Sequence, residues 1–186
     1  DDIMKKIEHT TEALDQTIKD LHHSLALKSA DKEKFRNVPL RDVMKDVNGL
    51  LSEEITKNGA SIETNFLEVD TVFGAKSYIV NIFYNLILNA INYSKQGVPA
   101  VIQIITEKTE QAIMLRFSDN GIGMELTPEK ERKIFDMYGR LSGTTEGKGF
   151  GLYLVKTQVE AMDGKIEVES EKDVGTIFTI TFPKVQ

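Results

Sequence analysis

The apolar residues of this chain recur with a helical period in three long segments. In residues 40–57 they fall every three or four positions, which predicts an amphipathic helix. Residues 77–94 are so apolar that, as a helix, most of their circumference must be buried. Residues 150–162 predict a third helix, and Asp163-Gly164 supplies its stop. The main part of the chain is therefore expected to hold about three helices.

Alternating apolar and polar residues predict strands between and after these helices. The strand-like segments are 60–66, 101–108, 112–118, 165–170 and 176–182. Taken in chain order, the patterns predict an α+β fold, a two-layer sandwich in which about three helices cover one face of a mixed β-sheet. Residues 121–148 form a polar, glycine-bearing stretch without clear strands. A loop of this length in a compact domain is uncommon, and it predicts a functional lid or a disordered segment.

The first 29 residues contain no Gly or Pro and show a narrower apolar stripe. The steps along this stripe alternate between three and four, through Met4, Ile7, Thr11, Leu14, Ile18, Leu21 and Leu25. This spacing predicts one long helix of the coiled-coil type. A lone helix cannot bury such a stripe, so it needs a partner helix in the same protein or in a second copy. The alternative is a frayed terminal helix on the domain surface.

Composition narrows the possible partners. A chain of 186 residues with 40% hydrophobic content can bury one sizeable core. A net charge of -6 argues against a nucleic acid held by a broad basic surface. The absence of cysteine excludes disulfides and thiolate metal sites, and it suits a reducing compartment. No apolar run reaches the roughly 18 residues of a membrane span, and no signal peptide opens the chain. Because the chain begins with Asp rather than Met, we expect it to be part of a longer protein.

Four asparagines interrupt the most apolar helix at steps of four, four and three: Asn81, Asn85, Asn89 and Asn92. This spacing places them on one stripe of the helix. Burying carboxamides is costly unless each has a partner. Their oxygens are neutral ligands that suit a Mg²⁺ ion arriving with phosphate. The alternative is that the stripe is simply the side of the helix that faces solvent.

Two glycine clusters bracket the long polar loop. The first, Asp-Asn-Gly-Ile-Gly-Met at 119–124, directly follows a predicted strand, although a hairpin turn needs only Asn-Gly. The second places Gly147, Gly149 and Gly151 just before a helix, where free N–H groups form a cradle for an anion. A flexible hinge explains the second cluster equally well. Its spacing matches neither a Walker A loop nor the dinucleotide-binding fingerprint.

The order of these motifs resembles the ATP-binding domain of sensor histidine kinases, within the gyrase, chaperone and histidine kinase ATPase superfamily. The matching segments are 85–94 for the N box, 119–124 for the first glycine box, 134–140 for the F box, 147–152 for the second glycine box and 175–182 for the closing strand. The resemblance extends to residues 14–25, which look like the second helix of a dimerisation hairpin. It implies three parts: a partial hairpin at 1–30, a linker at 31–35 and a catalytic ATP-binding domain at 36–186.

The resemblance implies how ATP and Mg²⁺ would bind. Asp119 would accept a hydrogen bond from the adenine amino group, and Gly121 and Gly123 would let the backbone pass beside the base. Asn89 would coordinate Mg²⁺, and Asn85 would support the metal or the phosphates. Tyr93 would lie along the nucleotide, while backbone N–H groups would bind phosphate at Gly147, Gly149, Gly151 and Leu152.

Two positions depart from the family pattern. Asn92, which the resemblance also places among the nucleotide-binding residues, stands where the family often has Lys or Arg. Lys95 or a lid arginine is therefore expected to supply the missing positive phosphate contact. Either Arg132 or Arg140 would reach the γ-phosphate. The F box ends in Tyr138 rather than the more usual Phe, and Phe135 and Tyr138 are expected to anchor the lid by packing.

Asn85 also bears on the type of reaction. Members that hydrolyse ATP typically carry Glu at this position, and a carboxamide cannot act as a general base. The substitution favours phosphoryl transfer to histidine over hydrolysis. His9, His22 and His23 lack the acidic and turn-forming residues that usually follow the acceptor. The acceptor is therefore expected on an upstream helix that this chain lacks.

The resemblance as a whole implies a two-component sensor histidine kinase whose phosphohistidine is relayed to an aspartate of a response-regulator receiver domain. It also implies pairing with a second protomer, a cytoplasmic location, no nucleic-acid partner and no direct membrane contact within this segment. Two alternatives stay open. One is an anti-sigma-factor-type serine kinase of the same fold, and the other is a pseudokinase that serves only as an interaction module.

Overall fold

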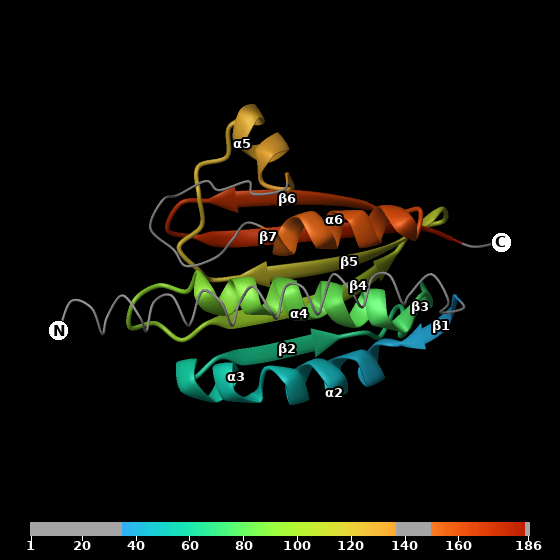
Figure 1. Ribbon diagram of the computed structural model, residues 1–186, viewed down its shortest axis with the longest axis horizontal. Helices are drawn as coiled ribbons and strands as arrows, with labels where there is room; N and C mark the ends of the chain where they lie inside the picture. Colours follow the sequence, from blue (N-terminus) through green and yellow to red (C-terminus); the bar gives the residue numbers. More distant parts are fainter. Residues whose placement is uncertain (1–34, 137–149, 185–186) are drawn as a thin grey trace, which may run out of the picture. The chain divides into compact units, whose positions relative to one another are not determined.

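The computed structural model describes residues 35–136 and 150–184. The helix expected over 1–30 and part of the predicted loop lie outside them. Figure 1 shows the elements, which in chain order are β1 (Arg36–Pro39), α2 (Leu40–Leu50), α3 (Ser52–Asn58), β2 (Ser61–Asn65), β3 (Thr71–Gly74), α4 (Lys76–Asn92), β4 (Val101–Lys108), β5 (Ala112–Asp119), α5 (Pro128–Lys133), α6 (Gly151–Ala161), β6 (Lys165–Glu171) and β7 (Gly175–Pro183).

The larger sheet has five strands in the order β2-β4-β5-β7-β6. β2 runs parallel to β4 and the other neighbouring pairs are antiparallel, so the sheet is mixed, as predicted. Its buried face can be followed along one line of register, where Ile104, Phe117, Phe178 and Val168 lie side by side. The helices α2, α4 and α6 cover one face of this sheet (Figure 1), which confirms the two-layer α+β prediction.

The apolar helix α4 forms the centre of the core. It packs between α2 and α6, and Phe83 meets Phe117 of β5 edge to face, with ring centroids 4.8 Å apart. Its seven buried residues are Ile79, Ile82, Phe83, Leu86, Ile87, Ala90 and Ile91. Because each large buried side chain stabilises the fold by about 1.5–3 kcal/mol, the orientation of α4 is firmly set. The position of its asparagine stripe follows from that orientation.

The single helix expected over 40–57 is in fact two helices, α2 and α3, which meet at Leu51. Leu51 is fully buried, with φ -105° and ψ 14°. The Ser52 hydroxyl donates to the Gly49 carbonyl oxygen at 3.2 Å. Gly49 has a low helix propensity and Ser52 bonds locally to the backbone, so the helical path breaks at this point.

Two short features escaped the sequence prediction. β1 and β3 form a second, antiparallel sheet with Val38 and Val72 on its buried face. Each strand has only four residues, which is too short for a clear alternation. The helix α5 lies inside the predicted loop, where Thr127 Oγ1 accepts a hydrogen bond from the Lys130 N–H at 3.3 Å and Pro128 is the first helical residue. Thr at the N-cap and Pro at the first position are a typical helix start.

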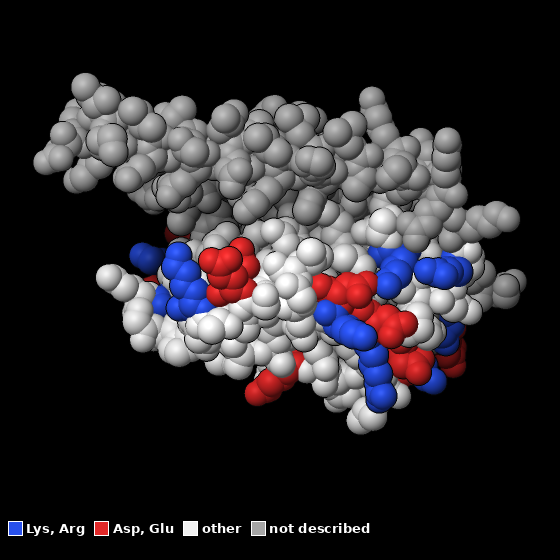
Figure 2. All heavy atoms as spheres, turned by 60° about the horizontal axis from the view of Figure 1, so that its bottom comes forward, with Lys and Arg blue, Asp and Glu red and all other residues white. Residues whose placement is uncertain are grey.

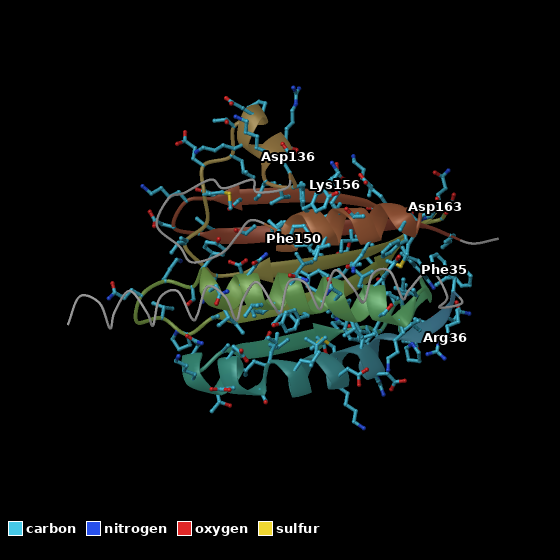
Figure 3. The ribbon with its side chains drawn as sticks, in the orientation of Figure 1. Phe35, Arg36, Asp136, Phe150, Lys156 and Asp163 are labelled. Atoms are coloured by element: carbon cyan, nitrogen blue, oxygen red, sulfur yellow. The ribbon has the colours of Figure 1, made fainter. Side chains whose placement is uncertain are left out.

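The predicted end of the third helix, α6, at Asp163-Gly164 is confirmed, and the two residues have different roles. Asp163 lies just past the end of α6 (Figure 3) and has φ 57°. Asp tolerates this left-handed conformation better than most residues. A Cβ on Gly164 would lie 2.7 Å from the Phe182 ring. Asp163 therefore turns the chain, and Gly164 allows its close approach to β7.

Charged side chains of both signs stand beside one another on the face shown in Figure 2. One ion pair joins two helices, Lys76 of α4 to Asp46 of α2, at 2.7 Å. Because a partly exposed pair of this kind contributes about 1 kcal/mol or less, burial rather than charge holds α2 on α4. Within the described ranges, no helix has the length and apolarity needed to cross a membrane.

Gln158 gives the first testable prediction. This residue of α6 is 2% exposed, and its Oε1 accepts no hydrogen bond from the residues that the structure describes. An unsatisfied buried acceptor costs about 1–3 kcal/mol. Gln158→Met, which keeps the length of the side chain, is expected to raise the free energy of unfolding by about 1 kcal/mol or more in urea titrations. Gln158→Glu should lower it at pH 7, and equal stability of both variants would contradict this account.

Candidate functional site

Asp119 stands at the end of β5, between Ile102 of β4 and Thr176 of β7. Its side chain is half-buried. Oδ1 accepts two backbone hydrogen bonds, from the Gly121 N–H at 2.8 Å and from the Thr176 N–H at 3.3 Å. Oδ2 accepts no hydrogen bond from any described residue. The carboxylate is thus held by one oxygen and offers the other to a ligand.

Burial raises the pKa of Asp119 above its ordinary value of 3.8. The hydrogen bonds from Gly121 and Thr176 and the positive charge of Lys95 act in the opposite direction. A carboxylate that is removed from water in this way forms stronger hydrogen bonds than an exposed one.

The loop after Asp119 lies against the C-terminal end of α4. The Ile122 N–H donates to the Tyr93 carbonyl oxygen at 2.9 Å, and a Cβ on Gly121 would lie 2.6 Å from the same oxygen. Gly123 has φ 57°, and its Cβ would overlap the carbonyl oxygen of Glu171. Both glycines are therefore required for packing against protein backbone, a reason that the sequence did not show. Their expected contact with a base stays a prediction.

Within the asparagine stripe of α4, Asn85 lies against the start of α6. Asn85 Nδ2 donates to the carbonyl oxygen and to Oδ1 of Asn81, each at 2.9 Å. The Oδ1 of Asn85 lies beside Gly151, where a Cβ would come within 2.7 Å of it. The side chain of Asn89 is half-buried and makes no hydrogen bond to other described residues, while Asn92 is exposed. The structure thus brings the N box, the first glycine box and Gly151 of the second into one region.

Four of the remaining predicted residues lie outside the described ranges: Tyr138, Arg140, Gly147 and Gly149. Leu152 is half-buried in the first turn of α6 and packs against the core. Tyr93 is 39% exposed at the end of α4, and Arg132 is exposed on α5. Phe135 is buried, and its ring packs on Phe178 with centroids 6.3 Å apart, as expected for the F box.

Three residues of the β6–β7 hairpin belong to the site although the sequence analysis did not single them out: Ser170, Gly175 and Thr176. Thr176 supplies one of the N–H donors to Asp119. Gly175 has φ 152°, and its Cβ would overlap the carbonyl oxygen of Asp119. In the sequence, Gly175 and Thr176 were recognised only as the start of the closing strand. Its contact with a loop some fifty residues earlier depends on sheet topology.

A family model described as "Histidine kinase-, DNA gyrase B-, and HSP90-like ATPase" matches residues 74–186. The chain belongs to this family. The match confirms the predicted ATP-binding domain of the gyrase, chaperone and histidine kinase ATPase superfamily. The match covers α4, the loop after Asp119, α6 and the closing strands β6 and β7.

Curated relatives of this chain are named histidine protein kinases. The histidine protein kinase SaeS of Staphylococcus aureus is 28% identical over 171 residues, covering 89% of this chain and 48% of the relative. SaeS of Staphylococcus epidermidis is 27% identical over 172 residues, covering 90% of this chain and 48% of the relative. The chain thus spans about half the length of these relatives.

Solved structures share the fold. The catalytic domain of histidine kinase ThkA is 25% identical, with a TM-score of 0.65, and the match covers 82% of this chain and 99% of that domain. The Acinetobacter baumannii histidine kinase AdeS is 20% identical, with a TM-score of 0.70, and the match covers 98% of this chain and 84% of AdeS. Full-length ShkA in complex with AMPPNP reaches a TM-score of 0.72 at 20% identity, over 92% of this chain and 36% of ShkA.

Proposed function

We propose that this domain binds Mg·ATP and transfers the γ-phosphoryl group to a histidine on an upstream helix of a longer protein, for relay to a response-regulator aspartate. The observation that carries the proposal is the arrangement of Asp119, which is half-buried and held through Oδ1, while Oδ2 accepts no hydrogen bond from a described residue. The loop that follows it is bonded to the C-terminal end of α4, the helix that carries the asparagine stripe. The name of the SaeS relatives, histidine protein kinase, supports the same reaction.

Asp119 would select adenine through hydrogen-bond polarity. An ionised carboxylate only accepts hydrogen bonds. Its Oδ2 therefore suits the amino group of adenine and disfavours guanine, which presents a carbonyl oxygen at the same place. The neighbouring Tyr93 is exposed enough at the end of α4 to lie along the nucleotide, and Lys95 would bring positive charge near it.

The residues of α4 fit a magnesium ion that arrives with phosphate. No cluster of three or more His, Asp or Glu side chains in the described residues could hold a metal alone. Asn89 offers a carboxamide oxygen that no described residue uses, whereas the Asn85 amide is fixed by its two bonds to Asn81. Asn89 would thus be the main ligand, with Asn85 in support. When bound, Mg²⁺ would neutralise charge on the phosphates.

Asn89→Ala is expected to remove most of the Mg²⁺ dependence of ATP binding, because the ion loses its protein ligand. Calorimetric titrations with ATP at several Mg²⁺ concentrations measure this effect. Asn92→Ala, which changes the exposed end of the same stripe, is the matched control and should keep the wild-type dependence. A magnesium dependence that is unchanged in Asn89→Ala would contradict the metal assignment.

Asn85 supports transfer rather than hydrolysis. Its Nδ2 donates two hydrogen bonds to Asn81, and its amide cannot accept a proton at neutral pH. Without a general base for water, the site is left with positioning and electrostatic stabilisation of the phosphoryl group. Residues 1–30 would supply one helix of a dimerisation hairpin that pairs with a second protomer, and residues 36–186 would be the catalytic domain.

Incubation with γ-labelled ATP tests the reaction. The chain alone should take up little acid-labile phosphate, whereas a longer form that includes the upstream helix should become labelled on histidine. Strong acid-labile labelling of His9, His22 or His23 in the chain alone would overturn the missing-acceptor proposal. Acid-stable label on a partner's serine would favour the anti-sigma-factor-type kinase, and a complete lack of ATP binding would favour the pseudokinase.

A further inference from the structure

The hydroxyl of Ser170 connects its strand, β6, to two other segments next to Asp119, the loop at 121–124 and the start of β7. Its Oγ, on β6, accepts a hydrogen bond from the Met124 N–H at 2.9 Å and donates to the Gly175 carbonyl oxygen at 2.9 Å. It also lies 3.0 Å from the Thr176 hydroxyl. Ser170 is half-buried. A serine hydroxyl has one proton to donate and two lone pairs to accept with, and all three are used here if Thr176 donates.

The segments that Ser170 joins are the ones that hold Asp119. Met124 ends the loop in which Gly121 donates its N–H to Asp119 Oδ1. Thr176 donates the second N–H to the same oxygen, from the strand that follows Gly175. The two donors, Gly121 and Thr176, lie 55 positions apart (176 − 121). Ser170 bonds to the segment of each, through the Met124 N–H and through the Thr176 hydroxyl. A change at Ser170 would therefore alter how both donors meet the carboxylate.

We propose that Ser170 is a positioning residue that sets base selectivity, by locking the loop at 121–124 to the hairpin so that Asp119 Oδ2 keeps one direction. The inference rests on the proposed adenine contact of Asp119. Selectivity depends on direction because a hydrogen bond weakens steeply when its angle falls below about 120°. A carboxylate that can rotate would instead meet either an amino group or, through water, a carbonyl group.

A purely structural role for Ser170 predicts a different result. If its hydroxyl only stabilised the hairpin, losing it would lower the fraction of domain that can bind any nucleotide. The apparent affinity for every nucleotide then falls by the same factor, and the ratio of two affinities stays constant. If Ser170 directs Asp119, the ratio itself changes. The ratio of dissociation constants for ITP and ATP therefore separates the two roles, since ITP carries a carbonyl group in place of the adenine amino group.

Ser170→Val and Ser170→Thr form a matched pair of nearly equal volume, of which only Thr keeps the hydroxyl. Calorimetric titrations with Mg·ATP and Mg·ITP should give a wild-type ratio of at least about tenfold in favour of ATP. The ratio should fall at least roughly threefold in Ser170→Val and return toward the wild-type value in Ser170→Thr. Thr179→Ala changes a half-buried hydroxyl of the same hairpin with no hydrogen bond to described residues, and it should keep the wild-type ratio.

The outcomes separate this inference from the proposed function. A wild-type ratio near one would refute the adenine contact of Asp119 itself. A clear wild-type preference that is preserved in Ser170→Val would leave that contact standing and overturn the role of Ser170. If the valine variant fails to fold, Ser170→Ala provides the same comparison with a smaller side chain.

Discussion

Asp119→Asn is expected to weaken ATP binding by at least about a hundredfold while the domain stays folded. Asn keeps an oxygen that can accept from the Gly121 and Thr176 N–H groups. Its second atom is then an amide nitrogen, which meets the adenine amino group donor to donor. The loss of a hydrogen bond to a charged group, about 1.5–3 kcal/mol, together with this repulsion accounts for the size of the effect.

Calorimetry with Mg·ATP and urea unfolding measure the two halves of this prediction. Asp173→Asn is the control, because Asp173 is exposed in the β6–β7 turn with φ 62°, a conformation that Asn also accepts. The control should bind ATP as the wild type does. An Asp119→Asn variant whose affinity stays within threefold of the wild type would contradict the proposed role.

The pH dependence of stability supplies a second readout for the same variant. Burial raises the pKa of Asp119 in the folded state above 3.8, so the folded protein holds this proton more tightly than the unfolded chain. The resulting stabilisation is complete below about pH 3.8 and is lost as the pH rises through the folded-state pKa. Asp119→Asn has no carboxyl group at this position, so its stability does not fall with pH for this reason. It should therefore gain stability relative to the wild type as the pH rises, and it should be at least as stable at pH 7.

Gly123→Ala is expected to cost about 3 kcal/mol or more of folding free energy and to impair ATP binding. A left-handed conformation costs an L-residue about 1–2 kcal/mol, and overpacking adds about 1–3 kcal/mol. Here φ is 57°, and the new methyl group would overlap the Glu171 carbonyl oxygen and lie 2.9 Å from that of Gly175. Since these are backbone atoms, the loop must move, which would break the Met124–Ser170 hydrogen bond.

Gly59→Ala isolates the conformational part of this cost. Gly59 has φ 60° at the end of α3, and a Cβ there meets no atom within 4 Å. It should lose only about 1–2 kcal/mol in urea unfolding and keep its ATP affinity. If both alanine variants lost the same stability, the close approach of Gly123 to the β6–β7 hairpin would not matter, and the packing account of this loop would be wrong.

The sequence predicted the elements that carry a long or strong pattern. The helix over 77–94 was predictable because its apolar residues cover more of the helix surface than a single buried face. The structure shows this helix as α4, Lys76–Asn92. The break at Leu51 was not, because the apolar period of α2 continues through it. The strands β1 and β3 were missed since four residues cannot display an alternation.

The site was predictable as a set of motifs but not as a set of contacts. The order of the motifs and the resemblance they carry pointed to Asp119 and the asparagine stripe. The hydrogen bond from Thr176 to Asp119 joins residues that lie 57 positions apart in the sequence. Gly123 and Glu171, whose backbones approach closely, are also far apart in the sequence. Such contacts follow from β5 pairing with β7 and β7 with β6. The two closing strands were predicted from their pattern, but their place beside β5 was not. The contacts of Ser170 and Thr176 with the Asp119 loop could therefore be found only in the structure.

A crystal structure of this chain with Mg²⁺ and a non-hydrolysable ATP analogue would show whether Asp119 binds adenine. The adenine amino nitrogen should lie about 3.0 Å from Asp119 Oδ2, with Oδ1 still bonded to the Gly121 and Thr176 N–H groups. An adenine bound elsewhere, or an Asp119 Oδ2 that faces solvent in the complex, would contradict the proposed adenine contact.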